Sequence, residues 1–186
     1  MKLNQILGTI AILFYIQYAF HSYSRETLFN ALWICHIGCL LVGLGLLSGI
    51  SQINAVGFFL LVVGNIGWAL YLLAGGELIL PSILTHIGGF LIGCFGIYKL
   101  GIPGFTFLNA ILCFVILQIL ARFTTPFPEN VNLAFSIQKG WEKYFSSHLT
   151  YLVFLYTLLT LSFYFLEFSL RKIVQRPGNV IIERVK

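Results

Sequence analysis

Six long apolar segments, separated by polar breaks, run through the chain. Each has about the 20 residues that a helix needs to cross a lipid bilayer. The predicted helices are Asn4–Phe20, Leu28–Leu47, Asn54–Gly75, Leu78–Leu100, Gly104–Phe123 and His148–Leu170. Only residues 124–147 make a long loop between them. The pattern predicts an all-α polytopic membrane protein, a bundle of about six transmembrane helices over residues 1–170 with a basic cytoplasmic tail over residues 171–186.

Composition supports a membrane environment and excludes other classes. The 186 residues are 59% hydrophobic and 9% charged, whereas a soluble domain has roughly a quarter charged residues. A chain with so few charges cannot make its surface compatible with water, so we expect membrane lipids to be its partners. The net charge of +5 is spread along the sequence. It forms no basic patch, and we expect no nucleic acid to bind.

Lysine and arginine predict the orientation, because cytoplasmic loops carry more of them. With both termini in the cytoplasm, the inner side holds Lys2, Lys99, Arg171, Lys172, Arg176, Arg184 and Lys186. The outer side then holds Arg25, Arg122, Lys139 and Lys143. This bias favours an N-in/C-in topology. The sequence has no long targeting segment, which favours a bacterial inner (cytoplasmic) membrane.

Ionisable side chains occur at one depth on two predicted helices. Cys35 and His36 lie about eight residues into the second helix, and His86 about nine residues into the fourth. Both helices run from the outside inward, so these groups lie roughly 10–13 Å below the outer boundary. Glycines follow Cys35 and His86 at helical spacing and let helices approach closely. We expect both side chains to point into the bundle.

The chemistry of a thiol at this depth depends on a partner. Adjacent helical residues project about 100° apart, so His36 is not expected to serve as the base for Cys35. His86, on another helix, is the expected partner, because a nucleophilic thiol needs a base that accepts its proton. The alternative is that the glycines only pack, that Cys35 is a small filler, and that each histidine is held by a carbonyl or an asparagine.

The long loop carries further candidate binding residues. Asn130 and Asn132 can hydrogen-bond a substrate head group or an oxyanion, and Lys143 and His148 follow at the outer interface. We assign these four residues, together with His36, to substrate binding. An interfacial belt of aromatic and basic residues is the alternative explanation. Two structural roles are also predicted: Asn65 bridges two helices, and Glu167 pairs with Arg171 at i+4.

Four short motifs occur in a characteristic order. They are Ile-Cys-His-Ile at Ile34–Ile37, Thr-His-Ile-Gly at Thr85–Gly88, Glu-Asn-Val-Asn-Leu at Glu129–Leu133, and an aromatic loop with Trp141 and Tyr144 that leads into His148. In this order the chain resembles the transmembrane protein 164 and YwaF-like family of integral membrane proteins. The resemblance covers roughly Leu28 to Leu170.

The resemblance implies an activity, namely CoA-independent acyl transfer or hydrolysis on phospholipids. In the family's pattern the Cys of Cys-His is the nucleophile and the later intramembrane His is its partner, which correspond to Cys35 and His86. Many bacterial relatives have His-Leu-Cys instead, and Gly38 stands here in place of that second cysteine. The departure leaves Cys35, and not Cys39, as the match.

Other functions are compatible with the same residues. The chain can be a small transporter or a membrane-complex assembly protein without catalysis. Two inward histidines, His36 and His86, can ligate a b-type haem, and Cys35, Cys39 and His86 have ligand types that suit Zn²⁺. The acyl-transfer hypothesis itself requires no cofactor and no metal ion.

Overall fold

The computed structural model describes residues 2–174, which are helical and contain no strand. The α-helices are α1 (Leu3–Ser24), α2 (Ile34–Ser48), α3 (Ser51–Leu73), α4 (Leu80–Ile83), α5 (Gly89–Leu100), α6 (Thr106–Thr124) and α7 (His148–Val174). A π-helical turn, η2 (Leu84–Gly88), joins α4 and α5 into one continuous helix. The 3-10 turns are η1 (Leu28–Leu32), η3 (Phe127–Glu129), η4 (Val131–Leu133) and η5 (Glu142–Tyr144). Of the predicted tail, residues 175–186 lie outside the described residues.

Five helices are long and apolar enough to cross a membrane: α1, α3, the continuous helix Leu80–Leu100, α6 and α7. The sixth, α2, is apolar but has only 15 residues. The prediction of an all-α polytopic bundle is confirmed. The segment Leu28–Leu47, which was predicted as one helix, is divided in the structure. It forms η1 and α2, which are separated at Trp33, whose ψ of 141° is not helical.

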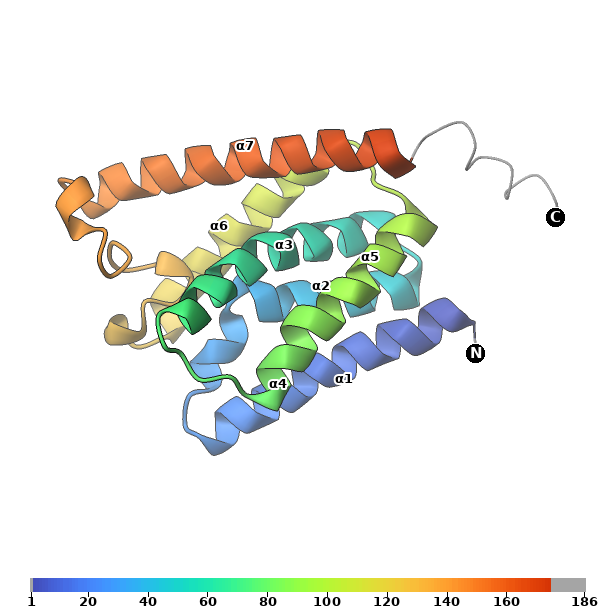
Figure 1. The fold of residues 1–186 in the computed structure, drawn as a ribbon, viewed down its shortest axis with the longest axis horizontal. Coiled ribbons are helices and arrows are strands. Elements are labelled where there is room, and N and C mark those ends of the chain that lie inside the picture. The colour runs from blue at the N-terminus through green and yellow to red at the C-terminus, as the bar shows by residue number, and fades with distance from the viewer. Residues whose placement is uncertain (1, 175–186) are drawn as a thin grey trace.

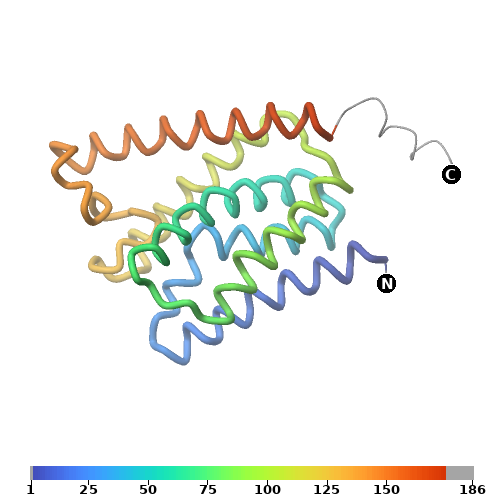
Figure 2. The backbone as a smooth tube through the Cα atoms, viewed as in Figure 1, coloured from blue at the N-terminus to red at the C-terminus, as the bar shows by residue number. Residues whose placement is uncertain are grey.

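The helices run back and forth between two ends of the molecule (Figures 1 and 2). The start of α1, the α2–α3 and α5–α6 connections and the end of α7 lie at one end. The α1–α2 and α3–α4 connections and the long loop after α6 lie at the other end. Six crossings therefore bring both ends of the described chain to one side, as the predicted topology requires.

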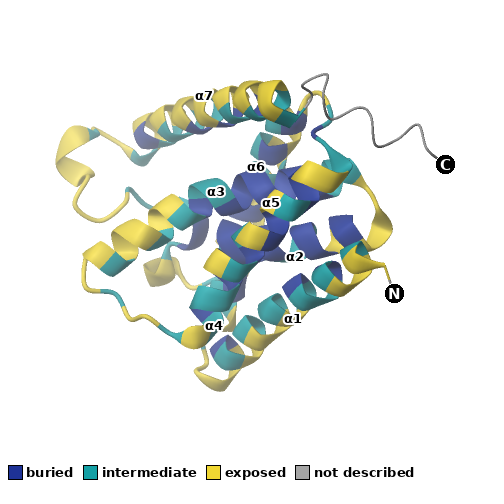
Figure 3. Cartoon of the chain, turned by 45° about the vertical axis from the view of Figure 1, so that its right-hand side comes forward, coloured by how far each residue is buried: buried dark blue, intermediate teal, exposed yellow. Residues whose placement is uncertain are grey.

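The core lies between α2, α3 and α5, where buried residues gather, while α1 and α7 show exposed outer faces (Figure 3). Close helix contacts depend on glycine: a Cβ at Gly38 would lie 2.8 Å from the carbonyl oxygen of Gly57. On α5, a Cβ at Gly93 would lie 2.8 Å from the Phe58 ring. The glycines that follow Cys35 and His86 at helical spacing are buried as predicted, except Gly49, which is exposed at the end of α2.

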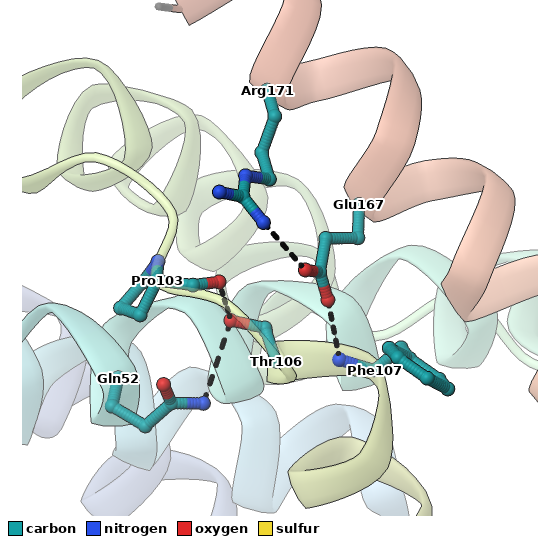
Figure 4. A network of polar contacts seen from close by, with 6 residues as sticks. All are labelled: Gln52, Pro103, Thr106, Phe107, Glu167 and Arg171. Atoms are coloured by element: carbon teal, nitrogen blue, oxygen red, sulfur yellow. Dashed lines mark hydrogen bonds and ion pairs between the residues drawn. The ribbon is translucent and has the colours of Figure 1, made fainter.

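A polar network joins α7 to the start of α6 (Figure 4). The Glu167 carboxylate accepts the Phe107 N–H at 2.9 Å and pairs with Arg171 at 3.3 Å, so the predicted i+4 pair is confirmed. A carboxylate is favourable at a helix N-terminus because it meets unpaired N–H groups and the positive end of the helix dipole. Thr106 donates to the Pro103 carbonyl at 2.9 Å and accepts from Gln52 at 3.4 Å. These contacts tie α7, α6 and α3 together.

Candidate functional site

The start of α2 is set by a side chain from the long loop. The Oδ1 of Asn132 accepts the N–H of Ile34 at 3.0 Å, and its Nδ2 donates to the carbonyl of Leu32 at 2.8 Å. The amide thus holds the chain on both sides of Trp33. It satisfies groups that a continuous helix would have paired internally. As a result, Cys35 is the second residue of α2.

The loop segment that carries Asn132 is itself held in an uncommon conformation. Asn130, Asn132 and Leu133 have φ values of 45°, 54° and 61°, and non-glycine residues keep such values only when their surroundings fix them. Gln118 donates to the carbonyls of Asn132 at 3.0 Å and Leu133 at 3.2 Å. The Leu133 carbonyl also lies 3.2 Å from Nε2 of His148. Contacts with Gln118 and His148 therefore hold the loop in place where it meets α2.

Three titratable side chains, which we call the Cys–His cluster, meet just below this capped end. They are Cys35 and His36 of α2 and His86 of the π-turn. The Sγ atom and one nitrogen of each ring lie within 4.8 Å of one another. The three residues are 7%, 3% and 2% exposed, respectively. The predicted meeting of Cys35 and His86 inside the bundle is therefore present in the structure.

The His86 ring is fixed on several sides. Its Nδ1 lies 2.8 Å from the Ser82 carbonyl oxygen, and its face stacks on Trp68 with ring centroids 4.5 Å apart. Its own carbonyl accepts Nδ2 of Asn65 at 3.2 Å, which confirms that Asn65 bridges two helices. Because a carbonyl only accepts, Nδ1 of His86 carries the proton and Nε2 keeps its lone pair. A π-turn at this point is itself notable, because such turns are frequent at functional sites.

His36 lies beside Cys35 in space as well as in sequence. Its ring stacks on Tyr18 of α1 with centroids 3.5 Å apart and meets His86 edge-on at 5.0 Å. Its Nδ1 lies 3.2 Å from Oγ1 of Thr85. The side chains of His36 and Cys35 therefore lie close together, contrary to the expectation from helical geometry, and the prediction that His36 is not the base stays a prediction. The first turn of α2 is enclosed by neighbours on several sides, so two positions about 100° apart both face the interior.

Unpaired polar atoms also gather around His86. Five buried side-chain nitrogen or oxygen atoms among residues 2–174 have no hydrogen-bond partner, and three of them are Nε2 of His86, Oδ1 of Asn65 and Nε1 of Trp68. The other two belong to Asn54. Buried polar groups normally have a partner. Trp68 stacks on the His86 ring and Asn65 binds the His86 carbonyl. These three unpaired atoms on contacting residues favour a site that takes up a polar ligand.

The other residues that were predicted to bind substrate lie outside the Cys–His cluster. The Asn130 side chain is used within the loop, where Oδ1 accepts the N–H groups of Phe135 and Ser136 at 2.9 and 3.0 Å. The Asn132 amide is used by the α2 cap. Lys143 is exposed, with its Nζ 4.8 Å from the centre of the Tyr144 ring. The predicted binding role of these residues and of His148 stays a prediction.

Sequence reasoning missed the residues that orient the histidines. Ser82 precedes His86 by four positions, and Thr85 is its direct neighbour, so helical spacing could have identified Ser82. Trp68 follows Asn65 by three positions on the same face of α3. Tyr18 carries no such signal, because only the packing of α1 against α2 brings it to His36.

The geometry does not fit two of the alternative sites, the Zn²⁺ site that includes Cys39 and the haem site between His36 and His86. Cys39 donates its thiol to the Ala11 carbonyl at 3.3 Å and packs against Gly89, so it points away from the Cys–His cluster. The imidazoles of His36 and His86 contact each other directly, and their faces stack on Tyr18 and Trp68. This packing leaves no space for a porphyrin between the two rings.

Comparison of the chain with protein-family models, with curated proteins and with solved structures gave no match. The resemblance to the transmembrane protein 164 and YwaF-like family accordingly stays a prediction from the motifs.

Proposed function

We propose that this protein transfers an acyl group from a membrane phospholipid through a thioester on Cys35, with His86 as the proton carrier. The observation that supports this function best is the distance of at most 4.8 Å between Sγ of Cys35 and a ring nitrogen of His86. A nucleophile next to a base that is oriented by a third group is the usual arrangement for covalent catalysis. Here the third group is the Ser82 carbonyl.

In the first half of the reaction, the Cys35 thiol gives its proton to Nε2 of His86 and Sγ attacks the carbonyl carbon of the lipid ester. The tetrahedral intermediate collapses with cleavage of the ester C–O bond. His86 returns the proton to the leaving alkoxide, which departs as the hydroxyl of a lysophospholipid. The acyl chain remains on Cys35 as a thioester, and no electrons are exchanged with a cofactor.

In the second half, a hydroxyl acceptor gives its proton to His86 and attacks the thioester carbonyl. Cleavage of the C–S bond then releases the acylated product, and the proton returns to Sγ. An acceptor lipid makes the protein a transferase, and water makes it a hydrolase. The same two side chains serve both halves, as microscopic reversibility requires.

The oxyanion needs donors near Sγ. The N–H of Cys35 is in the first turn of α2, where helical N–H groups have no internal acceptor. Among the described residues it has no other acceptor, because Asn132 binds the N–H of Ile34 and the Trp33 carbonyl accepts those of His36 and Ile37. Nε1 of Trp68 is a second unpaired donor. These groups take the role that the sequence analysis gave to Asn130 or Asn132.

The lipid head group belongs at the end where α2 begins, because ester groups lie just below the head groups. Lys143 lies on the loop before α7, and His148, the first residue of α7, contacts that loop at the Leu133 carbonyl. We assign Lys143 to the phosphate of the donor lipid and the bacterial cytoplasmic membrane to the protein, as parts of the same proposal.

Intact mass spectrometry tests the proposal. The purified protein is incubated with vesicles of 1-palmitoyl-2-oleoyl phosphatidylethanolamine, and its mass is compared with that of Cys35→Ser and Cys39→Ser variants. We expect one acyl adduct that hydroxylamine removes, present in the wild type and in Cys39→Ser and absent in Cys35→Ser. Cys39 is a matched control because it is a buried thiol one turn further along α2.

The absence of an adduct from all three proteins, with an unchanged lipid profile in cells that lack the protein, would contradict the proposal. That result would favour the transporter or assembly functions. An adduct that persists in Cys35→Ser would assign the nucleophile to another residue.

A further inference from the structure

The Cys–His cluster also has the composition of a metal site. It presents one thiol sulfur and two imidazole nitrogens, mutually within 4.8 Å, from two elements of the fold. Typical metal–thiolate and metal–imidazole distances of about 2.3 and 2.0 Å place the ligand atoms of a trigonal site about 3.7 Å apart. A bound ion therefore requires the side chains to close by about 1 Å or less, which rotation of the rings or of the Cys35 side chain can supply.

The tautomer of His86 suits metal coordination. Nδ1 of His86 donates to the Ser82 carbonyl at 2.8 Å, so Nε2 has the lone pair, and this atom has no partner among the described residues. Histidines that bind metals usually donate their second N–H to a carbonyl or carboxylate in this way, which fixes the tautomer. His86 therefore has the outer hydrogen bond of a metal ligand.

His36 has the same tautomer for a related reason. Oγ1 of Thr85 lies 3.0 Å from the Ser82 carbonyl and 3.2 Å from the Pro81 carbonyl, so its proton goes to a carbonyl. The hydroxyl oxygen then accepts from Nδ1 of His36, which lies 3.2 Å away. The lone pair of His36 is accordingly on Nε2, as it is in His86.

The charge of the site selects the ion. A thiolate with two neutral imidazoles carries one negative charge, which a monovalent cation neutralises and a divalent cation reverses. Net charge inside an apolar bundle is costly unless it is paired. Among residues 2–174, Glu167 is the only buried carboxylate. It binds the Phe107 N–H at the start of α6, at the end of the bundle away from the long loop (Figure 1). No carboxylate therefore compensates a divalent ion here.

We propose that Cys35, His36 and His86 bind one Cu(I) ion. Sulfur and imidazole ligands suit this soft cation, and Cu(I) accepts three ligands without a fourth. On binding, the Cys35 thiol loses its proton to the solvent as the Cu–S bond forms, and the oxidation state of copper does not change. The site differs from the Zn²⁺ site considered from the sequence, because His36 takes the place of Cys39. The inference stands on the geometry of the cluster and does not depend on acyl transfer.

Copper binding has a consequence for catalysis. A coordinated Sγ has given its lone pair to the metal, and a coordinated Nε2 of His86 cannot accept a proton. A protein loaded with Cu(I) is therefore expected to form no thioester. The same three side chains can then respond to copper as well as to lipid.

Competition with a chromogenic Cu(I) chelator tests the site. The purified protein in detergent is titrated anaerobically with Cu(I) against bicinchoninate, in parallel with Zn²⁺, and bound metal is counted by mass spectrometry. We expect one Cu(I) per chain, weaker binding of Zn²⁺, and a loss of Cu(I) affinity of at least about 100-fold in Cys35→Ser. Cys39→Ser is expected to bind like the wild type, and X-ray absorption of the wild-type complex to give one sulfur and two nitrogen ligands.

The proposal would be overturned if the wild type retained no Cu(I), if Cys35→Ser bound it equally well, or if Zn²⁺ bound as tightly. The absorption spectrum keeps the test decisive even if Cys35→Ser folds poorly, because it uses only the wild type. Copper binding without an acyl adduct would support this site and contradict the proposed function. An adduct without copper binding would do the reverse.

Discussion

Gly64 on α3 fixes how close Cys35 can lie to the neighbouring helix. A Cβ at this position would lie 2.6 Å from Cβ of Cys35 and 3.0 Å from its Cα, which is closer than real side chains approach. The obstructing atoms include backbone, so α2 itself has to move to make room. The position of Cys35 therefore depends on a residue without a side chain.

The first prediction concerns Gly64→Ala. Overpacking of this kind lowers the free energy of unfolding by about 1–3 kcal/mol, and we expect this loss in SDS denaturation from detergent micelles. Gly67, one turn further along α3, is the matched control, because nothing lies within 4 Å of an added Cβ there. Gly67→Ala is expected to raise the free energy by up to about 1 kcal/mol through helix propensity. Equal effects at both positions would show that α2 and α3 do not pack as described.

At the scale of residues, depth and helical spacing predicted that Cys35 and His86 meet. They did not predict that His36 joins the same cluster, because the rule for adjacent helical residues assumes that only one face of the helix is buried. The first turn of α2 is enclosed on several sides, with Tyr18, Thr85 and Gly64 around it. Only the packed structure contains that information.

At the scale of elements, Asn132 decides where α2 begins. Its amide pairs with groups of Leu32 and Ile34, which are 100 and 98 residues away in the sequence. No local pattern in the apolar run from Leu28 predicts a break at Trp33, so one helix was predicted where the structure has the two elements η1 and α2. The six apolar segments were nevertheless enough to predict the order of the apolar helices, five of which are long enough to cross a membrane, because a segment within a bilayer has to satisfy its backbone internally.

The second prediction is that Asn132→Ala frees the start of α2. The buried N–H of Ile34 and the partly buried carbonyl of Leu32 lose their partners, which costs on the order of 2–4 kcal/mol in the free energy of unfolding. Hydrogen exchange of the Ile34 N–H should accelerate in the same variant. Asn109→Ala is the control, because Asn109 is exposed on α6, and it is expected not to lower stability. An unchanged exchange rate at Ile34 in Asn132→Ala would contradict the capping role.

At the scale of the whole molecule, six crossings place the long loop and the α2–α3 connection at opposite ends (Figure 1). The Cys–His cluster lies near the end that carries the long loop, because Asn132 of that loop caps α2. If the predicted N-in/C-in topology holds, this end lies on the side of the membrane away from the cytoplasm. The catalytic and copper-binding proposals then concern the outer leaflet.

The third prediction tests this orientation. Lys143→Cys and Lys99→Cys each place a thiol at an exposed position, one at either end of the bundle. Intact bacterial cells are treated with a membrane-impermeant maleimide, which does not reach thiols within the bilayer. We expect labelling of Lys143→Cys in intact cells and of Lys99→Cys only after lysis. The opposite pattern would place the Cys–His cluster in the cytoplasmic leaflet.

The central claim is that the histidines make the Cys35 thiol reactive, and the relative alkylation rate of Cys35 and Cys39 tests it most directly. Both thiols are buried on α2, but Cys39 faces the Ala11 carbonyl and Cys35 faces two imidazoles. The purified protein in detergent is treated with N-ethylmaleimide, and peptide mass spectrometry follows each cysteine over time. We predict that Cys35 reacts at least about tenfold faster than Cys39, because a neighbouring base increases the thiolate fraction, and that His86→Ala removes this difference. Equal rates in the wild type, or a preference that survives in His86→Ala, would contradict the account.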